Sequence, residues 1–140
     1  MKILGIDYGD KRTGVAVSDD LLLTAQGLPT IFETGMKKTA EKIAAVAKET
    51  NSSSIVIGFP KNMDGTIGER GKKTEKLVRL LGEISEGIPI ILWDERLTTV
   101  YAQTIMNQTN VRGKKRKNEV DRLSATIILQ EYLDNRRNKL

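Results

Sequence analysis

The amino-acid sequence predicts an α/β domain built on one mixed, five-stranded sheet with helices on both faces. Three short apolar runs separated by turn residues come first, and helical patterns then alternate with two further apolar runs. The resulting order, β-β-β-α-β-α-β-α-α, is typical of a mixed sheet covered by helices. A chain of 140 residues can bury a sufficient core, so residues 1–140 are expected to form one domain.

The first three strands are expected to follow one another as hairpins. Residues 2–7 form an apolar run that ends in turn residues, and the glycine-containing turn after it predicts a hairpin to a second strand over residues 14–18. Residues 28–33 are expected to form a short third strand.

The middle of the chain alternates between helix and strand. Apolar residues at helical spacing predict helices over residues 36–49 and about 68–85, and apolar runs predict strands over residues 54–58 and 89–93. The side chains expected to face the core are Met36, Ala40, Ile43 and Ala47 in the first helix and Leu77, Leu81 and Ile84 in the second.

The last part of the chain is expected to be helical around a basic loop. Thr98 could cap a helix over residues 98–108, and a loop over residues 109–117 follows it. Asn118 is expected to cap a final helix over residues 119–134, which is apolar enough to pack on the sheet.

The amino-acid composition restricts the possible chemistry. The chain contains no Cys and no His, which excludes disulfides, thiol nucleophiles, Ser-His-Asp triads and His/Cys zinc sites. Carboxylates must therefore carry any hydrolytic chemistry, and clustered carboxylates favour Mg²⁺ or Mn²⁺ held by oxygen ligands. No apolar run could span a bilayer and no signal peptide is recognisable, so a cytoplasmic protein without membrane contact is expected.

Three acids are candidates for a metal-binding active site. Asp7 and Glu95 end apolar strands that are expected to run parallel, so they should emerge at one edge of the sheet. Asp121 continues an inward-facing stripe of the last helix, with Ala125, Ile128 and Tyr132 at helical spacing after it. Converging acids repel one another, and a divalent metal relieves that repulsion while activating water for phosphodiester hydrolysis.

Each acid also has a purely structural interpretation. Asp7 could cap the turn that follows it. Glu95 could pair with a neighbouring cation, and strand alternation allows Asp94 to be the acid that faces the site instead. Asp121 lies three residues after Asn118, where an acid favours a helix N-terminus whatever its function.

Basic residues near these acids are candidate substrate contacts. The net charge is +5, and the run Arg112-Gly113-Lys114-Lys115-Arg116-Lys117 could reach over a nucleic-acid backbone or could be a surface loop without a partner. The few aromatic residues argue against a stacking platform for single-stranded bases, so backbone or shape recognition fits better. The expected substrate-binding residues are Lys11, Arg12, Lys61, Arg96, Arg112, Lys114, Lys115, Arg116 and Lys117.

Four segments in order resemble the YqgF/RuvX family over the full length of the chain. They are DYGDKRTGVA at residues 7–16, VIGFPKNMDGT at 56–66, WDERLTT at 93–99, and residues 117–129 with Asp121. The resemblance implies an RNase H-like fold and a metal-dependent nuclease. It also implies that the family's acids fall on Asp7, Glu95 and Asp121.

The resemblance leaves the substrate and the number of metal ions open. Family members are described as nucleases that mature the 5′ end of pre-16S rRNA and as Holliday junction resolvases, so structured precursor RNA is the first candidate and four-way DNA the alternative. Many RNase H-like nucleases carry an acid at the end of the fourth strand, where this chain has Gly58-Phe59-Pro60, so one or two ions remain possible. A two-fold-symmetric junction would require a homodimer, whereas one RNA end would not.

Two further classes compete with a nuclease. An ATP-binding phosphotransferase of the actin and sugar-kinase type also has an Asp-x-Gly turn after its first strand, but it needs two such domains and this chain supplies one. A non-catalytic RNA-binding assembly factor is the other alternative, which the three acids disfavour.

Overall fold

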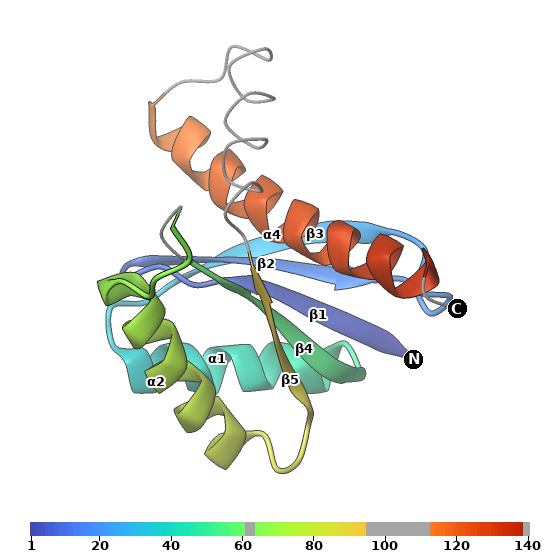
Figure 1. Ribbon diagram of the computed structural model, residues 1–140, viewed down its shortest axis with the longest axis horizontal. Coiled ribbons are helices and arrows are strands. Elements are labelled where there is room, and N and C mark those ends of the chain that lie inside the picture. Colours follow the sequence, from blue (N-terminus) through green and yellow to red (C-terminus); the bar gives the residue numbers. More distant parts are fainter. Residues whose placement is uncertain (61–63, 95–112, 139–140) are drawn as a thin grey trace.

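The computed structural model contains a twisted sheet covered by helices on both faces (Figure 1). It describes residues 1–60, 64–94 and 113–138, and over residues 113–122 and at residue 138 only the backbone is described. The predicted helix over residues 98–108 lies outside the described part of the chain.

The sheet has five strands in the order β3-β2-β1-β4-β5. β1 pairs antiparallel with β2 and parallel with β4, β2 pairs antiparallel with β3, and β4 pairs parallel with β5. The predicted fold and the predicted parallel arrangement of the first, fourth and fifth strands are therefore confirmed. The strands are β1 Lys2–Asp7, β2 Arg12–Ser18, β3 Ala25–Phe32, β4 Ser52–Phe59 and β5 Ile90–Asp94.

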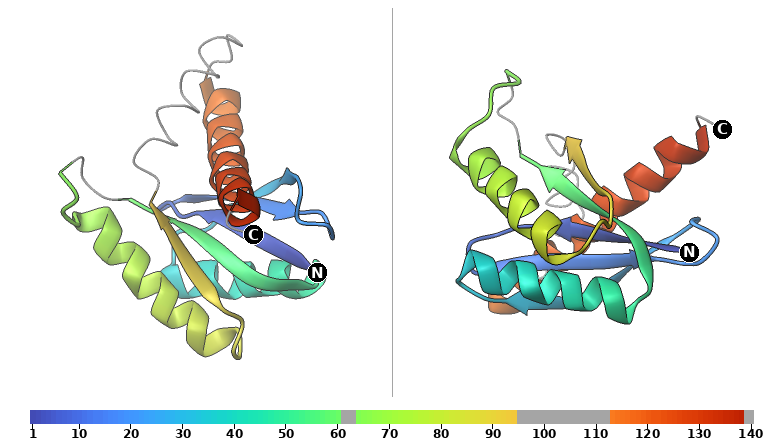
Figure 2. Two further views of the ribbon diagram at one scale, coloured as in Figure 1. Left: turned by 45° about the vertical axis from the view of Figure 1, so that its right-hand side comes forward. Right: turned by 90° about the horizontal axis from the view of Figure 1, so that it is seen from below.

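The helices divide between the two faces of the sheet. α1 (Met36–Glu49) and α2 (Glu69–Ile84) lie side by side under one face, while α4 (Gly113–Asn138) crosses the other (Figures 1 and 2). α1 begins and ends where the sequence predicted. None of the described helices is long and apolar enough to cross a membrane.

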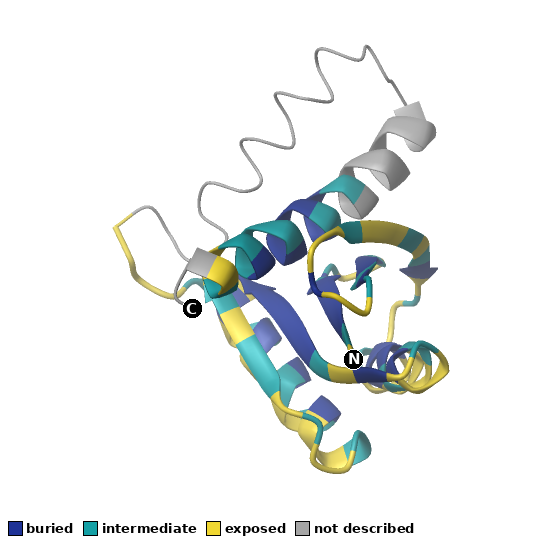
Figure 3. Cartoon of the chain, turned by 90° about the vertical axis from the view of Figure 1, so that its right-hand side faces the viewer, coloured by how far each residue is buried: buried dark blue, intermediate teal, exposed yellow. Residues whose placement is uncertain are grey.

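Each face of the sheet contributes to its own apolar cluster. Leu4 and Ile6 of β1 are completely buried against α1 and α2, whereas Ile3 packs with α4. This alternation is the period-2 pattern of a strand that is covered on both faces. The buried residues accordingly concentrate in the central strands and on the helix sides that face them (Figure 3). The predicted inward residues of α1 and α2 all belong to the first cluster or pack against it.

Gly5 allows α4 to lie close to the middle of the sheet. A Cβ at this position would stand 2.7 Å from the Cβ of Leu129 and 3.3 Å from the carbonyl oxygen of Ala125. Gln130 fixes the same helix to the start of β3, because its side chain accepts a hydrogen bond from the Ala25 N–H at 2.9 Å and donates one to the Leu23 carbonyl at 2.9 Å.

The predicted start of the last helix is wrong. α4 begins at Gly113, so the basic residues 114–117 are helical and not part of a loop. Asn118 lies inside the helix and does not cap it. Lys and Arg are good helix formers, and a run of positive charge does not by itself end a helix. The helix also extends beyond the predicted end at residue 134, to Asn138.

Candidate active site

The carboxyl ends of the three parallel strands meet at one edge of the sheet, which we call the acid edge. β1 ends there at Asp7, β4 at Phe59 and β5 at Asp94, and β2 starts there at Arg12. In open α/β sheets this edge is where ligands bind. The structure thus brings together the strand ends that the sequence placed at one edge.

Asp7 lies on the sheet face that α4 covers, with glycines on both neighbouring strands. It pairs with Gly14 of β2, and Gly58 follows Ile57, the β4 partner of Ile6. Residues side by side on adjacent strands share a face, so no side chain flanks Asp7 on either side at this level. The side chain of Asp7 is partly buried at this position.

The turn after Asp7 is held in place by α2. A Cβ on Gly9 would stand 2.3 Å from the Arg12 carbonyl oxygen, so only glycine fits this tight turn. Arg70 donates a hydrogen bond to the Tyr8 carbonyl at 3.2 Å, and Lys73 forms an ion pair with Asp10 at 3.3 Å. The sequence did not reveal Arg70 and Lys73 as residues of the site, because their partners lie 62 and 63 residues away in the chain and no local pattern marks such contacts.

Tyr8 points away from Asp7 into the other face of the sheet. Its ring belongs to the apolar cluster under α1 and α2, and burial raises the pKa of the phenol, with the nearby charge of Asp10 adding to the effect. The phenol therefore stays protonated and neutral near pH 7. Asp10 pairs with Lys73, whereas Asp7 lies between the two glycine positions on the α4 face.

β5 distinguishes the two neighbouring acids at its end. Trp93 packs in the cluster under α4, where its ring centroid lies 5.9 Å from that of Tyr132 and its indole N–H donates to Glu131 at 3.4 Å. Because successive strand residues point to opposite faces, Asp94 lies on the face away from α4 and away from Asp7. Glu95 lies outside the described residues.

The third predicted acid, Asp121, belongs to α4, the helix that crosses above β1. Ala125, Leu129 and Leu133, one turn apart, are completely buried against this face of the sheet. Asp121 occupies the backbone position one turn before Ala125 and lies beyond the first turn of the helix. The structural interpretation of Asp121 as an acid at a helix N-terminus is therefore wrong, because that effect fades within the first turn.

The predicted substrate-binding residues are only partly described. Lys11 is exposed in the turn after Asp7, and Arg12 is partly buried at the start of β2. The backbone of residues 114–117 is helical. Lys61, Arg96 and Arg112 lie outside the described residues.

The whole chain matches a known protein family. The family model RuvX, described as Holliday junction resolvase, matches residues 1–135. The chain belongs to the RuvX family. It is therefore a nuclease, a hydrolase acting on phosphodiester bonds, and the resemblance in the sequence is confirmed.

Relatives of this RuvX chain cover nearly its entire length. A protein of Thermoanaerobacter pseudethanolicus, provisionally named a pre-16S rRNA nuclease, is 47% identical over 140 residues, which is 99% of this chain and 100% of that protein. A protein of Clostridioides difficile with the same name is 48% identical over 95% of this chain and 94% of its own length.

Solved resolvase structures share the RuvX fold. Thermus thermophilus RuvC in complex with a Holliday junction has a TM-score of 0.60 at 12% identity, covering 99% of this chain and 96% of that one. The fowlpox virus resolvase in complex with junction DNA has a TM-score of 0.55 at 12% identity, covering 96% and 98%. These likenesses confirm the predicted RNase H-like architecture.

The donor atoms at the acid edge of the RuvX chain suit a hard divalent cation. Among the side chains that the structure describes, no group of three acids gathers, and two of the three predicted ligands, Glu95 and Asp121, are not among them. Asp7 supplies carboxylate oxygen, a hard ligand that fits Mg²⁺ or Mn²⁺ and not a soft metal.

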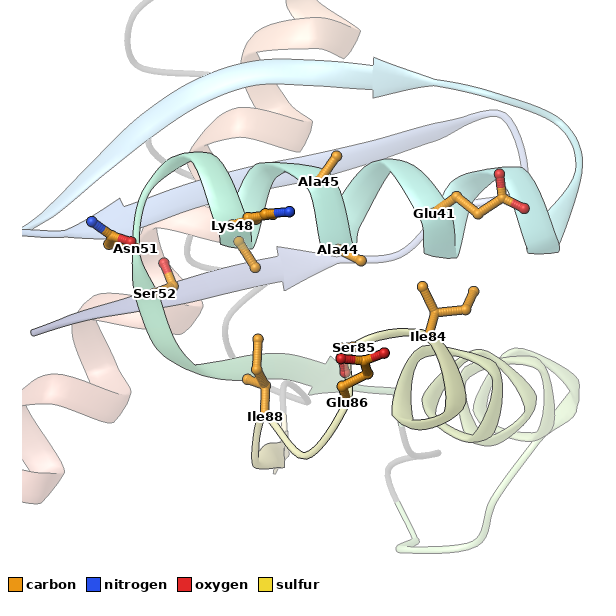
Figure 4. Close-up of a pocket in the computed structure, with 11 residues that line it drawn as sticks. Glu41, Ala44, Ala45, Lys48, Asn51, Ser52, Ile84, Ser85, Glu86 and Ile88 are labelled. Carbon is orange, nitrogen blue, oxygen red and sulfur yellow. The ribbon is translucent and has the colours of Figure 1, made fainter.

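A pocket between α1 and α2 lies at the opposite end of the sheet. It has a volume of about 630 Å³ and is lined by residues including Lys48, Ser52 and Glu86 (Figure 4). Ser52 begins β4, whereas the acid edge is at the other end of that strand. The pocket is therefore separate from the candidate active site.

Proposed function

We propose that this chain is a divalent-metal-dependent endonuclease that matures the 5′ end of pre-16S rRNA in the cytoplasm. Asp7, Glu95 and Asp121 are proposed as the catalytic acids. The observation that carries the proposal is the position of Asp7, at the carboxyl end of the central strand, between two glycine positions and on the face that α4 covers.

The three acids would hold one or two Mg²⁺ or Mn²⁺ ions through their oxygens. A bound divalent ion lowers the pKa of a coordinated water and offsets charge on the leaving oxygen. The chain's own groups orient the substrate around it. Lys11 and Arg12 supply positive charge for a phosphate at the turn beside Asp7, and the Arg70 and Lys73 contacts fix that turn.

Glu95 is preferred to Asp94 as the second acid. Asp94 lies on the sheet face opposite Asp7, because it follows Trp93, which packs under α4. Asp121 is proposed as the third acid because it continues the stripe of α4 that lies over β1, one turn before Ala125.

RNA is proposed as the substrate because the relatives that are 44–48% identical carry the name of a pre-16S rRNA nuclease. The family description favours a second candidate, cleavage of a four-way DNA junction. A junction-cleaving protein would act as a homodimer, because a two-fold-symmetric substrate calls for two symmetric active sites.

A cleavage assay separates these candidates. Purified protein with Mn²⁺ is offered a 16S precursor RNA or a four-way DNA junction, each labelled at a 5′ end, and its mass in solution is measured alongside. Faster cleavage of the RNA by a monomer supports the proposal. Symmetric cleavage of the junction by a dimer would replace it with the second candidate, and binding of RNA without cleavage would indicate an assembly factor.

A further inference from the structure

The end of β3 presents one exposed aromatic side chain beside the acid edge. Phe32 is 56% exposed, although large apolar side chains usually avoid water. It pairs with Arg12 of β2, and on the same strand Gly14 pairs with Asp7. Paired residues share a face, so Phe32, Arg12 and Asp7 all belong to the face of the sheet that α4 covers.

We propose that Phe32 is a substrate-positioning residue that stacks on an unpaired base while Arg12 contacts the adjacent phosphate. This inference rests on the proposed nuclease function and specifies how the substrate would lie. β1 and β3 are separated by two strand spacings, about 10 Å in total, which corresponds to about three stacked base steps. A single-stranded segment whose scissile phosphate lies at Asp7 can therefore reach Phe32.

The backbone around Phe32 is held in place in the absence of substrate. The Glu33 N–H donates a hydrogen bond to the Lys11 carbonyl at 3.2 Å, and Lys42 donates to the Phe32 carbonyl at 3.4 Å. Lys42 also forms an ion pair with Glu33 at 3.0 Å. Because the backbone is already held, binding would order only the side-chain torsions of Phe32, which favours its use as a stacking surface.

The charges around Phe32 favour a nucleic acid over an apolar protein partner. Lys11 and Arg12 lie on one side, and Lys42, which is half exposed, lies on the other. Lys38 is close enough to help hold the pKa of Glu33 below its usual range, although the hydrogen bond from Lys42 is the larger cause. With Lys73, these cations outnumber the nearby acids Asp7, Asp10 and Glu33 by five to three. A surplus of positive charge suits a polyanion, whereas the core of a protein interface is depleted of charge.

One stacking residue is compatible with the low aromatic content of the chain. Removal of a base–aromatic stack typically weakens binding by about 5- to 150-fold. Phe32 would thus add local order to a substrate held mainly through its backbone. It favours a substrate with an unpaired nucleotide about three base steps from the cleaved bond over a continuous duplex.

The test measures stacking separately from cleavage. Single-stranded RNA carrying 2-aminopurine at successive positions is titrated in EDTA with wild-type protein, Phe32→Leu, Phe32→Tyr and the control Leu21→Ala. Leu21 is a suitable control because it is 75% exposed and lies in the turn between β2 and β3, at the end of the sheet away from the acid edge. Circular dichroism confirms that each variant is folded.

Wild-type protein and Phe32→Tyr are expected to change the 2-aminopurine fluorescence at one position, and Phe32→Leu is expected to lose that change and bind about tenfold more weakly. Equal binding and equal fluorescence changes for Phe32→Leu and wild type would overturn the inference. So would a Phe32→Leu variant that dissociates a dimer without altering the fluorescence change. A third result separates the two proposals. If Phe32→Leu loses the fluorescence change but the wild-type protein cleaves no substrate, the proposed function is contradicted and the stacking inference stands.

Discussion

Asp7, Asp10 and Asp94 all lie near the acid edge, but each has different surroundings. Asp7 lies between two glycine positions on the α4 face, Asp10 pairs with Lys73, and Asp94 lies on the opposite face of the sheet. The sequence made Asp7 a candidate ligand and Asp94 the alternative to Glu95. Their surroundings favour Asp7.

The two neighbouring acids after Trp93 should differ in their effect on activity. Glu95→Gln is expected to lower kcat by about 100-fold or more, because loss of a group that acts directly in the reaction typically has an effect of this size. Asp94→Asn is expected to retain most of the activity because Asp94 faces away from Asp7. Single-turnover cleavage with saturating Mn²⁺ measures both, and the reverse ranking would move the catalytic role to Asp94.

Gly5 should be needed for the close packing of α4 on the sheet. Gly5→Ala places a Cβ 2.7 Å from the Leu129 Cβ and is expected to lower the free energy of unfolding by about 1–3 kcal/mol. Gly82→Ala is the matched control, because a Cβ there meets nothing within 4 Å and alanine stabilises a helix interior by about 0.5–1 kcal/mol. Urea denaturation measures both changes, and a neutral Gly5→Ala would show that α4 can shift without cost.

At the scale of elements, α4 connects the basic segment to the sheet. Residues 113–117 lie on the same continuous helix as Ala125 and Leu129, which pack on β1. A helix holds its N-terminal residues at a fixed direction from the core, which a loop would not do. The basic segment is thus an extension of the helix that carries Asp121.

Neutralising this segment should weaken nucleic-acid binding in a salt-dependent manner. Lys114, Lys115 and Arg116 are changed together to Gln, a good helix former that preserves α4. The slope of log K against log salt is expected to fall by about 0.7 for each lost contact with single-stranded RNA. A triple variant of Lys48, Lys76 and Arg79 is the control of equal charge. Equal slopes for the two variants would mean that the α4 segment does not contact phosphate.

The elements differ in how well the sequence predicted them. α1 was predicted to the residue, because its apolar positions repeat cleanly at helical spacing. The start of α4 was missed because Asn118 resembled a cap and the preceding charges resembled a loop, although neither prevents a helix. Contacts such as that of Arg70 with the Tyr8 carbonyl join residues far apart in the sequence, so no local pattern could reveal them.

At the scale of the whole molecule, two apolar clusters share one sheet. One lies under α1 and α2 and the other under α4, and β1 and β4 contribute to both. The same strands lie between the two clusters and contribute side chains to both. Disruption of one cluster should therefore expose the side chains of the other cluster to water. The RuvX chain is therefore expected to unfold as one cooperative unit.

Trp93 provides a direct measurement of that cooperativity. It is the only tryptophan of the chain, and it packs against Tyr132 of α4. Its fluorescence is expected to change at the same urea concentration as the far-UV circular dichroism. A fluorescence transition at lower urea would show that α4 detaches before the rest of the domain unfolds.

The central claim is that a carboxylate at the end of β1 makes this fold a metal-dependent nuclease. The most direct test compares Mn²⁺-dependent cleavage by wild-type protein, Asp7→Asn and the control Asp20→Asn, with substrate binding measured for each in EDTA. Asp7→Asn is expected to abolish cleavage while binding stays within about twofold of wild type. Asp20→Asn is expected to keep its activity, because it removes only an exposed ion pair with the N-terminus, at the end of the sheet away from the acid edge. Cleavage by Asp7→Asn at the wild-type rate would contradict the account.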